Sequence, residues 1–357
     1  MKTKIVYVLT CAPEATYIEQ ALMAVWSARY HNPDAHIVLM TDDKTEALLT
    51  GKRGEILNYI SEKIVVPFED EALSPMYRSR WIKTQVRQLI EGDFLFVDSD
   101  TICQRPLNDI DSFDCEVGAV YESHLLINDF YPSLYRSAKI QFANLGMELD
   151  YEKEYFSSGV LYVKDTERTH QLYKLWHQNW QISYTKGVPM DQPSLAQSNR
   201  ELGRIIRLIP DTYNCILFTQ PLFVREAHIL HIAAYRNPAF IFSNRVLNFV
   251  REVGIENEWI QEIMLNPCAT MMPFDYALKH SSIHQRVTWT NEISAFWKGY
   301  GRMVDNTYAD FSFGLHLDKI IHYLLRHGCA KMAIYLYLIE YRFHLRKKQV
   351  KENVCHK

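Results

Sequence analysis

Two aspartates separated by one residue follow a short apolar stretch. Phe94–Val97 predicts a buried strand, and Asp98 and Asp100 come at its carboxyl end. Open α/β sheets bind ligands just outside the carboxyl ends of their strands. Because residues two apart on a strand point the same way, we expect both carboxylates to converge on one ligand. Paired carboxylates favour a hard cation, so the motif predicts Mg²⁺ or Mn²⁺ that bridges to a phosphate-bearing substrate.

Strand-like and helix-like patterns alternate through the first two hundred residues. Short apolar runs bounded by polar or turn-forming residues predict strands, and apolar residues three and four apart predict helices. The alternation is typical of an α/β fold, a mostly parallel twisted sheet with helices on both faces. The expected strands are 4–9, 36–40, 63–66, 94–97, 117–121, 156–163 and 228–232, and the expected helices are 14–30, 56–60, 77–90, 166–180 and 191–199.

The character of the sequence changes after Pro238. Mainly helical periodicity and little strand character mark the later segments, which are 240–253, 258–265, 290–300 and 317–348. We therefore expect an α/β domain over 1–239 and a mainly helical C-terminal region over 240–357.

Composition is that of an ordinary globular protein. The chain has 357 residues, 48% apolar and 23% charged, with a formal net charge of −3, which argues against a nucleic-acid-binding body. Its seven cysteines form no Cys-x-x-Cys pair, which argues against a zinc or disulfide framework and favours a cytoplasmic setting. No apolar run approaches the roughly 18 residues of a membrane span. We interpret 4–9 as the first strand and not as part of a signal peptide, because Thr10 and Pro13 follow at once.

The C-terminal residues are basic. Residues 318–357 contain nine Lys or Arg and three Asp or Glu, a balance of +6. Within 331–348 aromatic and aliphatic residues are interleaved with basic ones, a pattern that suits peripheral contact with the anionic inner face of a membrane. The alternative is a helix that packs on the α/β domain and keeps its charges in water.

Several blocks of this sequence together resemble the nucleotide-sugar-dependent glycosyltransferases of the GT-A fold, most closely the family-8 type. The blocks come in the family's order, and they are 4–10, the helix with Arg80 and Lys83, 94–101, 155–163, 190–195 and 229–238. The resemblance implies a GT-A catalytic domain over 1–239. It also implies metal-dependent transfer of a hexose from a nucleotide-diphosphate sugar, most commonly a UDP-sugar, to a glycan or glycoconjugate acceptor.

In that family a strand-end Asp-x-Asp and a late histidine bind the cation. The resemblance therefore implies Asp98, Asp100 and His231 as the metal ligands. An imidazole ligand favours Mn²⁺ over Mg²⁺. His228 is an alternative ligand, and a buried structural histidine is the alternative role for His231.

Five further residues correspond to the family's contacts with the nucleotide and the sugar. Thr10 and Tyr17 lie where the first loop holds the nucleobase, and Asp42 closes the second strand near the base or ribose. Arg80 and Lys83 are three apart and hence on one helix face; in the family such a pair binds the sugar and phosphates. Cap residues and solvated charges are the alternative interpretations.

Two short motifs resemble the family's donor-sugar pocket. Ser157-Ser158-Gly159 corresponds to an Asn-Ser-Gly turn, and Ser158 and Gly159 would face the sugar, although Ser157 replaces the usual asparagine. Asp191 and Gln192 match a pair that faces the anomeric carbon and would be catalytic. A glutamine is too weak a nucleophile for double displacement, so the resemblance implies a retaining reaction by front-face departure of the nucleoside diphosphate.

Other functions are compatible with part of the sequence. Asp98-Ser99-Asp100-Thr101 also fits the first motif of haloacid-dehalogenase-type phosphatases, in which Asp98 would be the nucleophile. That motif normally sits on the opening strand, and no Gly-Asp-x-x-x-Asp motif follows here. A non-catalytic protein that binds a sugar nucleotide is the third possibility. The sequence leaves the donor sugar, the acceptor and the oligomeric state open.

Overall fold

The computed structural model describes residues 1–124, 126–127, 132–147, 154–216, 226–232, 240–242, 244–265 and 267. Met1–His231 and Asn248–Leu265 form one compact unit, and Ile232–Leu247 belong to a second unit. The domain boundary expected near residue 239 stays a prediction. The helices expected at 290–300 and 317–348, with the basic tail, lie outside the described residues.

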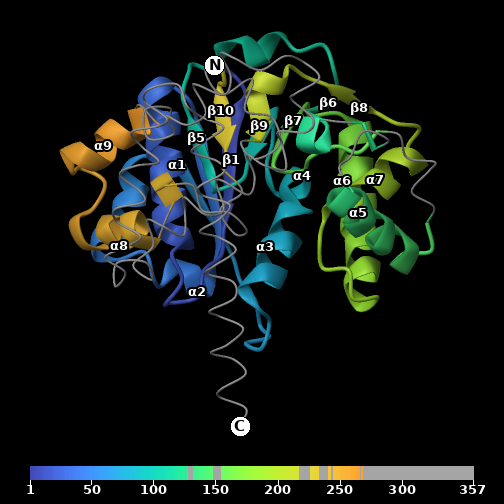
Figure 1. Ribbon diagram of the computed structural model, residues 1–357, viewed down its shortest axis with the longest axis horizontal. Coiled ribbons are helices and arrows are strands. Elements are labelled where there is room, and N and C mark those ends of the chain that lie inside the picture. Colours follow the sequence, from blue (N-terminus) through green and yellow to red (C-terminus); the bar gives the residue numbers. More distant parts are fainter. Residues whose placement is uncertain are drawn as a thin grey trace, which may run out of the picture. The chain divides into compact units, whose positions relative to one another are not determined.

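A seven-stranded sheet forms the centre of the first unit (Figure 1). Its strand order is β3-β2-β1-β4-β7-β6-β8, and only β7 runs antiparallel to its neighbours. The expected α/β class with a mostly parallel sheet flanked by helices is therefore confirmed. The strands are β1 Lys4–Leu9, β2 Ile37–Asp42, β3 Glu62–Val66, β4 Phe94–Val97, β6 Val117–Ala119, β7 Val160–Val163 and β8 Ile206–Leu208.

The central strands are apolar because both of their faces are covered. Every residue of β2 and of β4 is buried, and in β1 only Lys4 is not fully buried. Such continuous apolar runs are typical of parallel strands between two helical layers. Helix α1 (Tyr17–His31) contributes buried residues from Ile18 to Ala28. Helix α6 (Glu167–Thr185) begins at a capping box formed by Thr166 and Thr169.

The helix expected over 77–90 is two helices. Helix α3 (Pro75–Lys83) begins at Ser74, whose side chain accepts a hydrogen bond from the Tyr77 amide. It ends at Thr84, whose hydroxyl donates to the Arg80 carbonyl at 2.9 Å, and helix α4 (Val86–Leu89) follows. The remaining described helices are α2 Asp43–Glu46, η1 Gly51–Asn58, η2 Asn108–Ser112, η3 Glu122–His124, α5 Pro132–Asn144, α7 Gln192–Glu201, η6 Asp211–Asn214 and η8 Phe240–Phe242.

A second, three-stranded sheet lies across the end of the Asp-x-Asp strand. It consists of β5 (Thr101–Cys103), β10 (Ile229–His231) and β9 (Cys215–Ile216), in the order β5-β10-β9. The antiparallel pairing of β10 with β5 places His231 opposite Thr101. This sheet brings a histidine from late in the chain to the Asp-x-Asp motif.

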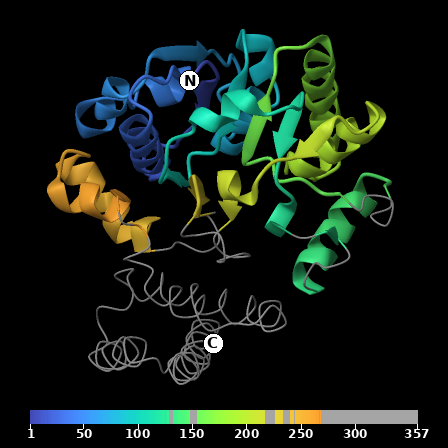
Figure 2. The ribbon, with the colours of Figure 1, turned by 90° about the horizontal axis from the view of Figure 1, so that it is seen from above.

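Two helices follow near the end of the described chain, and their residues from Asn248 onward belong to the first unit. Helix α8 is Asn244–Val253 and helix α9 is Glu258–Leu265, the latter with the bounds expected from the sequence. Figures 1 and 2 both show α9 beside α1, and the two helices are in contact. Within the described part of the chain, no helix is both long and apolar enough to cross a membrane.

Candidate functional site

The Asp-x-Asp motif occupies the turn between two strands. Strand β4 ends at Val97 and β5 begins at Thr101, so Asp98 and Asp100 both lie outside regular strands. The Thr101 hydroxyl donates to the Asp98 carbonyl at 2.8 Å and closes the turn. The strand alternation invoked to align the carboxylates therefore does not apply, and the turn itself brings them together.

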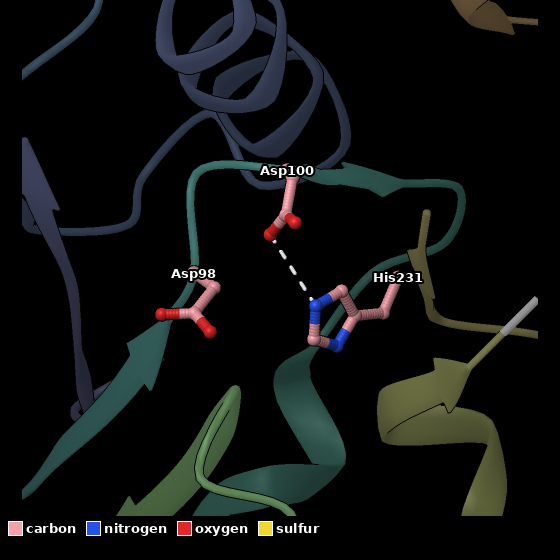
Figure 3. A group of neighbouring side chains, drawn as sticks. All are labelled: Asp98, Asp100 and His231. Carbon is pink, nitrogen blue, oxygen red and sulfur yellow. Dashed lines mark ion pairs between the residues drawn. The ribbon is translucent and has the colours of Figure 1, made fainter. Parts of the chain in front are cut away.

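Asp98, Asp100 and His231 form one cluster (Figure 3). One ligand atom from each lies within 4.8 Å of the others, and His231 Nε2 is 3.3 Å from Asp100 Oδ1. The other ring nitrogen, Nδ1, is 2.9 Å from Asn214 Oδ1. With Nδ1–H donating to this amide oxygen, Nε2 is left to face the carboxylates, which is the arrangement that orients metal-binding histidines.

The alternative ligand, His228, has different neighbours. Its Nδ1 is 3.2 Å from the Thr212 hydroxyl, and its ring stacks on Tyr213 with 4.4 Å between centroids. Among the described residues, the cluster that could hold a metal ion contains His231 and not His228.

Gly159 makes room for the cluster. Its carbonyl accepts a hydrogen bond from the Asp98 amide at 2.8 Å. A Cβ at this position would overlap the imidazole Cε1 of His231 and lie 3.1 Å from Asp98 Oδ2. The turn before β7 therefore needs glycine so that the histidine can approach the aspartates.

Lys83 connects the cluster to the donor-sugar residues expected from the sequence. Its Nζ lies 3.2 and 3.4 Å from the two oxygens of Asp98, 3.2 Å from Asp191 Oδ2 and 3.3 Å from Ser158 Oγ. The ammonium also sits 4.8 Å from the centre of the Phe96 ring. The side chain is only 3% exposed, so this charge acts in a low-dielectric setting where its contacts are strong.

Asp191 is held by two of the three cations of α3, Arg80 and Lys83. Arg80 Nε lies 3.0 Å from Asp191 Oδ1, and Lys83 approaches the other oxygen. Burial acts to raise the pKa of the Asp191 carboxyl, but Lys83 and Arg80 outweigh burial and lower this pKa to about 2. The carboxylate is therefore ionised at neutral pH, and the Trp176 indole N–H donates to its backbone carbonyl at 2.9 Å.

The pKa values of the two aspartates in the cluster are shifted in opposite directions. Burial raises the pKa of Asp98, and the charge of Asp100 adds to this effect against the opposing influence of Lys83. Burial also acts to raise the pKa of Asp100, but His231 lowers it overall. Burial would lower the pKa of His231, yet Asp100 raises it overall. A metal binds neutral imidazole, so a cation held at this cluster would compete with a proton for His231.

Gln192 has a partner that the sequence did not indicate. Its Nε2 donates to Glu122 Oε2 at 2.7 Å and lies 3.3 Å from the Phe156 carbonyl. Glu122 lies in η3, next to the β-bridge between Tyr121 and Phe156. A single glutamate in a short three-residue helix belongs to no recognisable sequence motif. Only the fold shows that Glu122 lies beside Gln192.

Charge counting supports a cation at this site. The three aspartates and Glu122 bring four formal negative charges, and Lys83 and Arg80 bring two positive charges. With His231 neutral, as a metal ligand must be, one divalent cation would balance this surplus of two negative charges. Oxygen ligands with one imidazole fit Mn²⁺ or Mg²⁺, and the imidazole favours Mn²⁺.

The residues expected at the nucleobase lie at the ends of β1 and β2. Thr10 donates its hydroxyl to the Pro75 carbonyl at 2.6 Å, and Tyr17, the first residue of α1, is 39% exposed. Asp42 is fully buried: one oxygen accepts from the Thr45 amide and the other pairs with Arg78. A carboxylate so occupied supports the loop as a helix cap and has no exposed oxygen for a base or ribose.

Comparisons with known proteins show similarity in structure. No protein family and no curated protein sequence matches this chain. Mouse xyloside xylosyltransferase 1 (apo form) has 15% identity and a TM-score of 0.42 over 65% of this chain and 97% of its own. The galactosyltransferase LgtC, solved with donor and acceptor sugar analogues, has 16% identity and a TM-score of 0.45 over 73% and 99%.

The bifunctional glycosyltransferase WbbM (apo) is a third similar structure, with 12% identity and a TM-score of 0.46. The match covers 73% of this chain and 51% of the WbbM chain, so this chain corresponds to about half of that protein. At these identities and scores the similarity carries no inference about activity, and the chemistry of the site has to be argued from its own residues.

Proposed function

We propose that this protein is a metal-dependent glycosyltransferase that moves a hexose from a nucleotide-diphosphate sugar, preferably a UDP-sugar, to a glycan or glycoconjugate acceptor. One observation carries the proposal. Two carboxylates and an imidazole converge beside a buried lysine and an arginine, where the central parallel strands end. Such a site combines a place for a cation with fixed positive charges, which together suit a diphosphate.

Asp98, Asp100 and His231 would hold the cation, Mn²⁺ by preference. When bound, it supplies Lewis-acid stabilisation of the charge that develops on the nucleoside diphosphate as it leaves. Arg80 and Lys83 supply further positive charge from one face of α3. Because Lys83 is nearly fully buried and already held by Asp98, its charge is in place before the substrate arrives, which lowers the reorganisation cost.

Asp191, Gln192, Ser158 and Gly159 form the donor-sugar side of the proposed site. Both oxygens of Asp191 lie within ion-pair distance of a cation, which makes this carboxylate a poor nucleophile. The Gln192 amide is a weak nucleophile as well, and it is oriented by a hydrogen bond to a glutamate. These features favour front-face departure with retention of configuration over a covalent glycosyl-enzyme intermediate.

The loop from Thr10 to Tyr17 would hold the nucleoside. Tyr17 offers a ring that is 39% exposed for stacking on the base. We assign Asp42 a supporting role, because its capping of α2 and its pairing with Arg78 shape the neighbouring strand end.

The phosphatase alternative is less well supported by the site. As the nucleophile, Asp98 would have to attack phosphorus, but both of its oxygens lie within 3.4 Å of the Lys83 ammonium. It also follows an internal strand, β4, and not the opening strand of the chain.

A screen of nucleotide sugars for Mn²⁺-dependent hydrolysis tests the proposal without knowledge of the acceptor. We expect one donor, a UDP-hexose first, to be hydrolysed with release of the nucleoside diphosphate and retention at the anomeric carbon, read by NMR. Activity unaffected by excess chelator would contradict the metal-dependent reaction. Release of phosphate from simple phosphomonoesters would favour the phosphatase.

A further inference from the structure

We propose that Arg251 of helix α8 is a positioning residue for donor binding, because it holds the loop between β1 and α1 in place from a distant part of the chain. This inference rests on the proposed function, in which that loop binds the nucleoside. Arg251 lies outside the region over which the sequence resembles glycosyltransferases, and it contacts neither the metal-binding cluster nor Asp191 in any described interaction.

The first part of the evidence is a buried carboxylate shared by two arginines. Glu19 in the first turn of α1 is 1% exposed. Its Oε1 lies 2.7 Å from Arg53 Nε and 2.7 Å from Arg251 Nε, and its Oε2 lies 3.5 and 3.2 Å from their Nη2 atoms. Arg53 comes from η1 and Arg251 from α8, so two distant segments meet at one residue of α1. We call Arg53 and Arg251 the arginine pair.

The arginine pair also binds the backbone of the loop that precedes α1. The Ala15 carbonyl accepts from Arg53 Nη2 at 2.8 Å and from Arg251 Nη2 at 2.6 Å. The Pro13 carbonyl accepts from Arg53 at 3.0 Å, and the Glu14 carbonyl lies 3.5 Å from the Arg251 guanidinium. Three consecutive loop carbonyls are therefore held by planar guanidinium groups, whose several fixed N–H donors suit this task.

The loop held in this way leads directly into the proposed site. Strands β1 and β4 are parallel neighbours with Val6 beside Phe96; continuing this register sets Val8 level with Asp98, and the loop begins just after, at Thr10. Thr10 at the start of the loop is bonded to the first residue of α3, the helix that carries Arg80. Tyr17 lies at the other end of the loop. The arginine pair thus fixes the position of the backbone between Thr10 and Tyr17, the two residues expected at the nucleobase.

Helix α8 is itself anchored where it presents Arg251. Gly254 just after the helix has a φ of +85°, and a Cβ there would lie within 2.8 Å of the Glu55 carboxyl carbon. Glu55 Oε2 accepts a hydrogen bond from the Ile255 amide at 2.8 Å. The end of α8 therefore rests on η1, the same segment that provides Arg53, and this fixes the position of Arg251.

Loss of Arg251 would loosen the loop without unfolding the sheet. Arg53 would still pair with Glu19 and with the Ala15 carbonyl, but α8 would no longer be linked to the loop. The loop would then have to be ordered when the nucleotide binds, and that ordering lowers the apparent affinity. Chemistry on the bound donor would change little, since Arg251 contacts none of the proposed reacting groups.

Binding of UDP in the presence of saturating Mn²⁺, measured by calorimetry on the full-length protein, tests this inference. We expect Arg251→Ala to raise the Kd for UDP about tenfold and the KM for the donor in parallel, with kcat of donor hydrolysis within about threefold of wild type. Arg251→Lys retains the positive charge but not the planar guanidinium with its several fixed donors. It should raise the Kd for UDP by at least about threefold.

Arg29→Ala is the matched control. Arg29 holds carbonyls in the same manner at the opposite end of α1, where it donates to those of Tyr59, Pro33 and Ala35 at 2.7 to 3.0 Å. Its loss and the loss of Arg251 should both lower the melting temperature, but loss of Arg29 should leave the Kd for UDP unchanged.

The outcomes separate the inference from the proposed function. If wild-type protein binds neither UDP nor any other nucleoside diphosphate, the proposed function fails, and the inference fails with it. If wild type binds UDP but Arg251→Ala binds it equally well, or Arg29→Ala weakens binding to the same extent, the positioning role alone is refuted. Should Arg251→Ala not fold, Arg251→Lys decides: wild-type affinity in that variant overturns the inference.

Discussion

Replacement of Gly159 by alanine should weaken metal binding although glycine provides no ligand. The added Cβ would overlap the imidazole of His231 at Cε1 and come within 2.9 Å of Nδ1. Both Asp98 and His231 border this position, so the new methyl group has no direction in which it can be accommodated without moving a proposed ligand. The hydrogen bond between His231 Nδ1 and Asn214 would be disturbed at the same time.

The size of the effect follows from two contributions. Overpacking of a filled site costs roughly 1–3 kcal/mol. Disturbing the groups that orient a metal ligand typically lowers metal affinity about 10- to 100-fold, which corresponds to roughly 1.4–2.8 kcal/mol. We therefore expect the Kd of Gly159→Ala for Mn²⁺ to rise about 10- to 100-fold, with His231→Ala as the upper limit.

Electron paramagnetic resonance of free Mn²⁺ in the presence of the protein measures this Kd without any enzymatic assay. Gly118→Ala is the matched control, because a Cβ there would lie 2.5 Å from Ile209 Cγ2 and 3.2 Å from Cys115 Sγ, in the core and away from the cluster. Gly118→Ala should lower stability and leave the Kd for Mn²⁺ within about twofold. Wild-type Mn²⁺ affinity in Gly159→Ala would refute the arrangement of the cluster described above.

Three further predictions concern the site and the stability of the fold. Asp100→Asn should lower donor hydrolysis at least about a hundredfold, near 3 kcal/mol of barrier, with an unchanged circular dichroism spectrum. In Glu122→Gln the Gln192 amide loses its charged acceptor, so the factor by which kcat falls should be about ten times the factor by which KM changes. Equal factors for the two constants would contradict this role. Burial lowers the pKa of His177 from 6.5 to about 4, so the unfolded chain binds a proton between these values that the folded protein does not. Stability should therefore fall by up to roughly 2 kcal/mol as pH drops from 6.5 to 4, and His177→Asn should remove this part of the loss in urea unfolding at pH 7 and pH 5.

Local patterns in the sequence predicted much of the central sheet. Strand β1 has the expected bounds, and β3 and β4 begin within one residue of theirs. These strands are buried on both faces, so their apolar residues form unbroken runs that stand out from the flanking turns. The expected helix at 258–265 was also confirmed, with the bounds of α9.

Pairing between distant segments could not be read from such patterns. Strand β10 falls within the expected strand 228–232, but β5 and β9 have three and two residues, too few to show a period. The pairing of β10 with β5 joins segments more than one hundred residues apart in the sequence. The antiparallel course of β7 in an otherwise parallel sheet was likewise not expected. In each case the deciding energy is the packing and hydrogen bonding of the assembled sheet, which no single segment contains.

The same division holds for the site. The sequence by itself determined the Asp-x-Asp motif, because two carboxylates after an apolar strand form a local pattern with a chemical meaning. The resemblance named His231 with His228 as the alternative, and the tertiary structure separates the two, because the pairing of β10 with β5 sets His231, and not His228, beside the motif. The tertiary structure also buried Asp42, placed Glu122 beside Gln192 and brought Arg251 to Glu19. Those positions depend on which distant surfaces pack together, and this packing is a property of the whole fold.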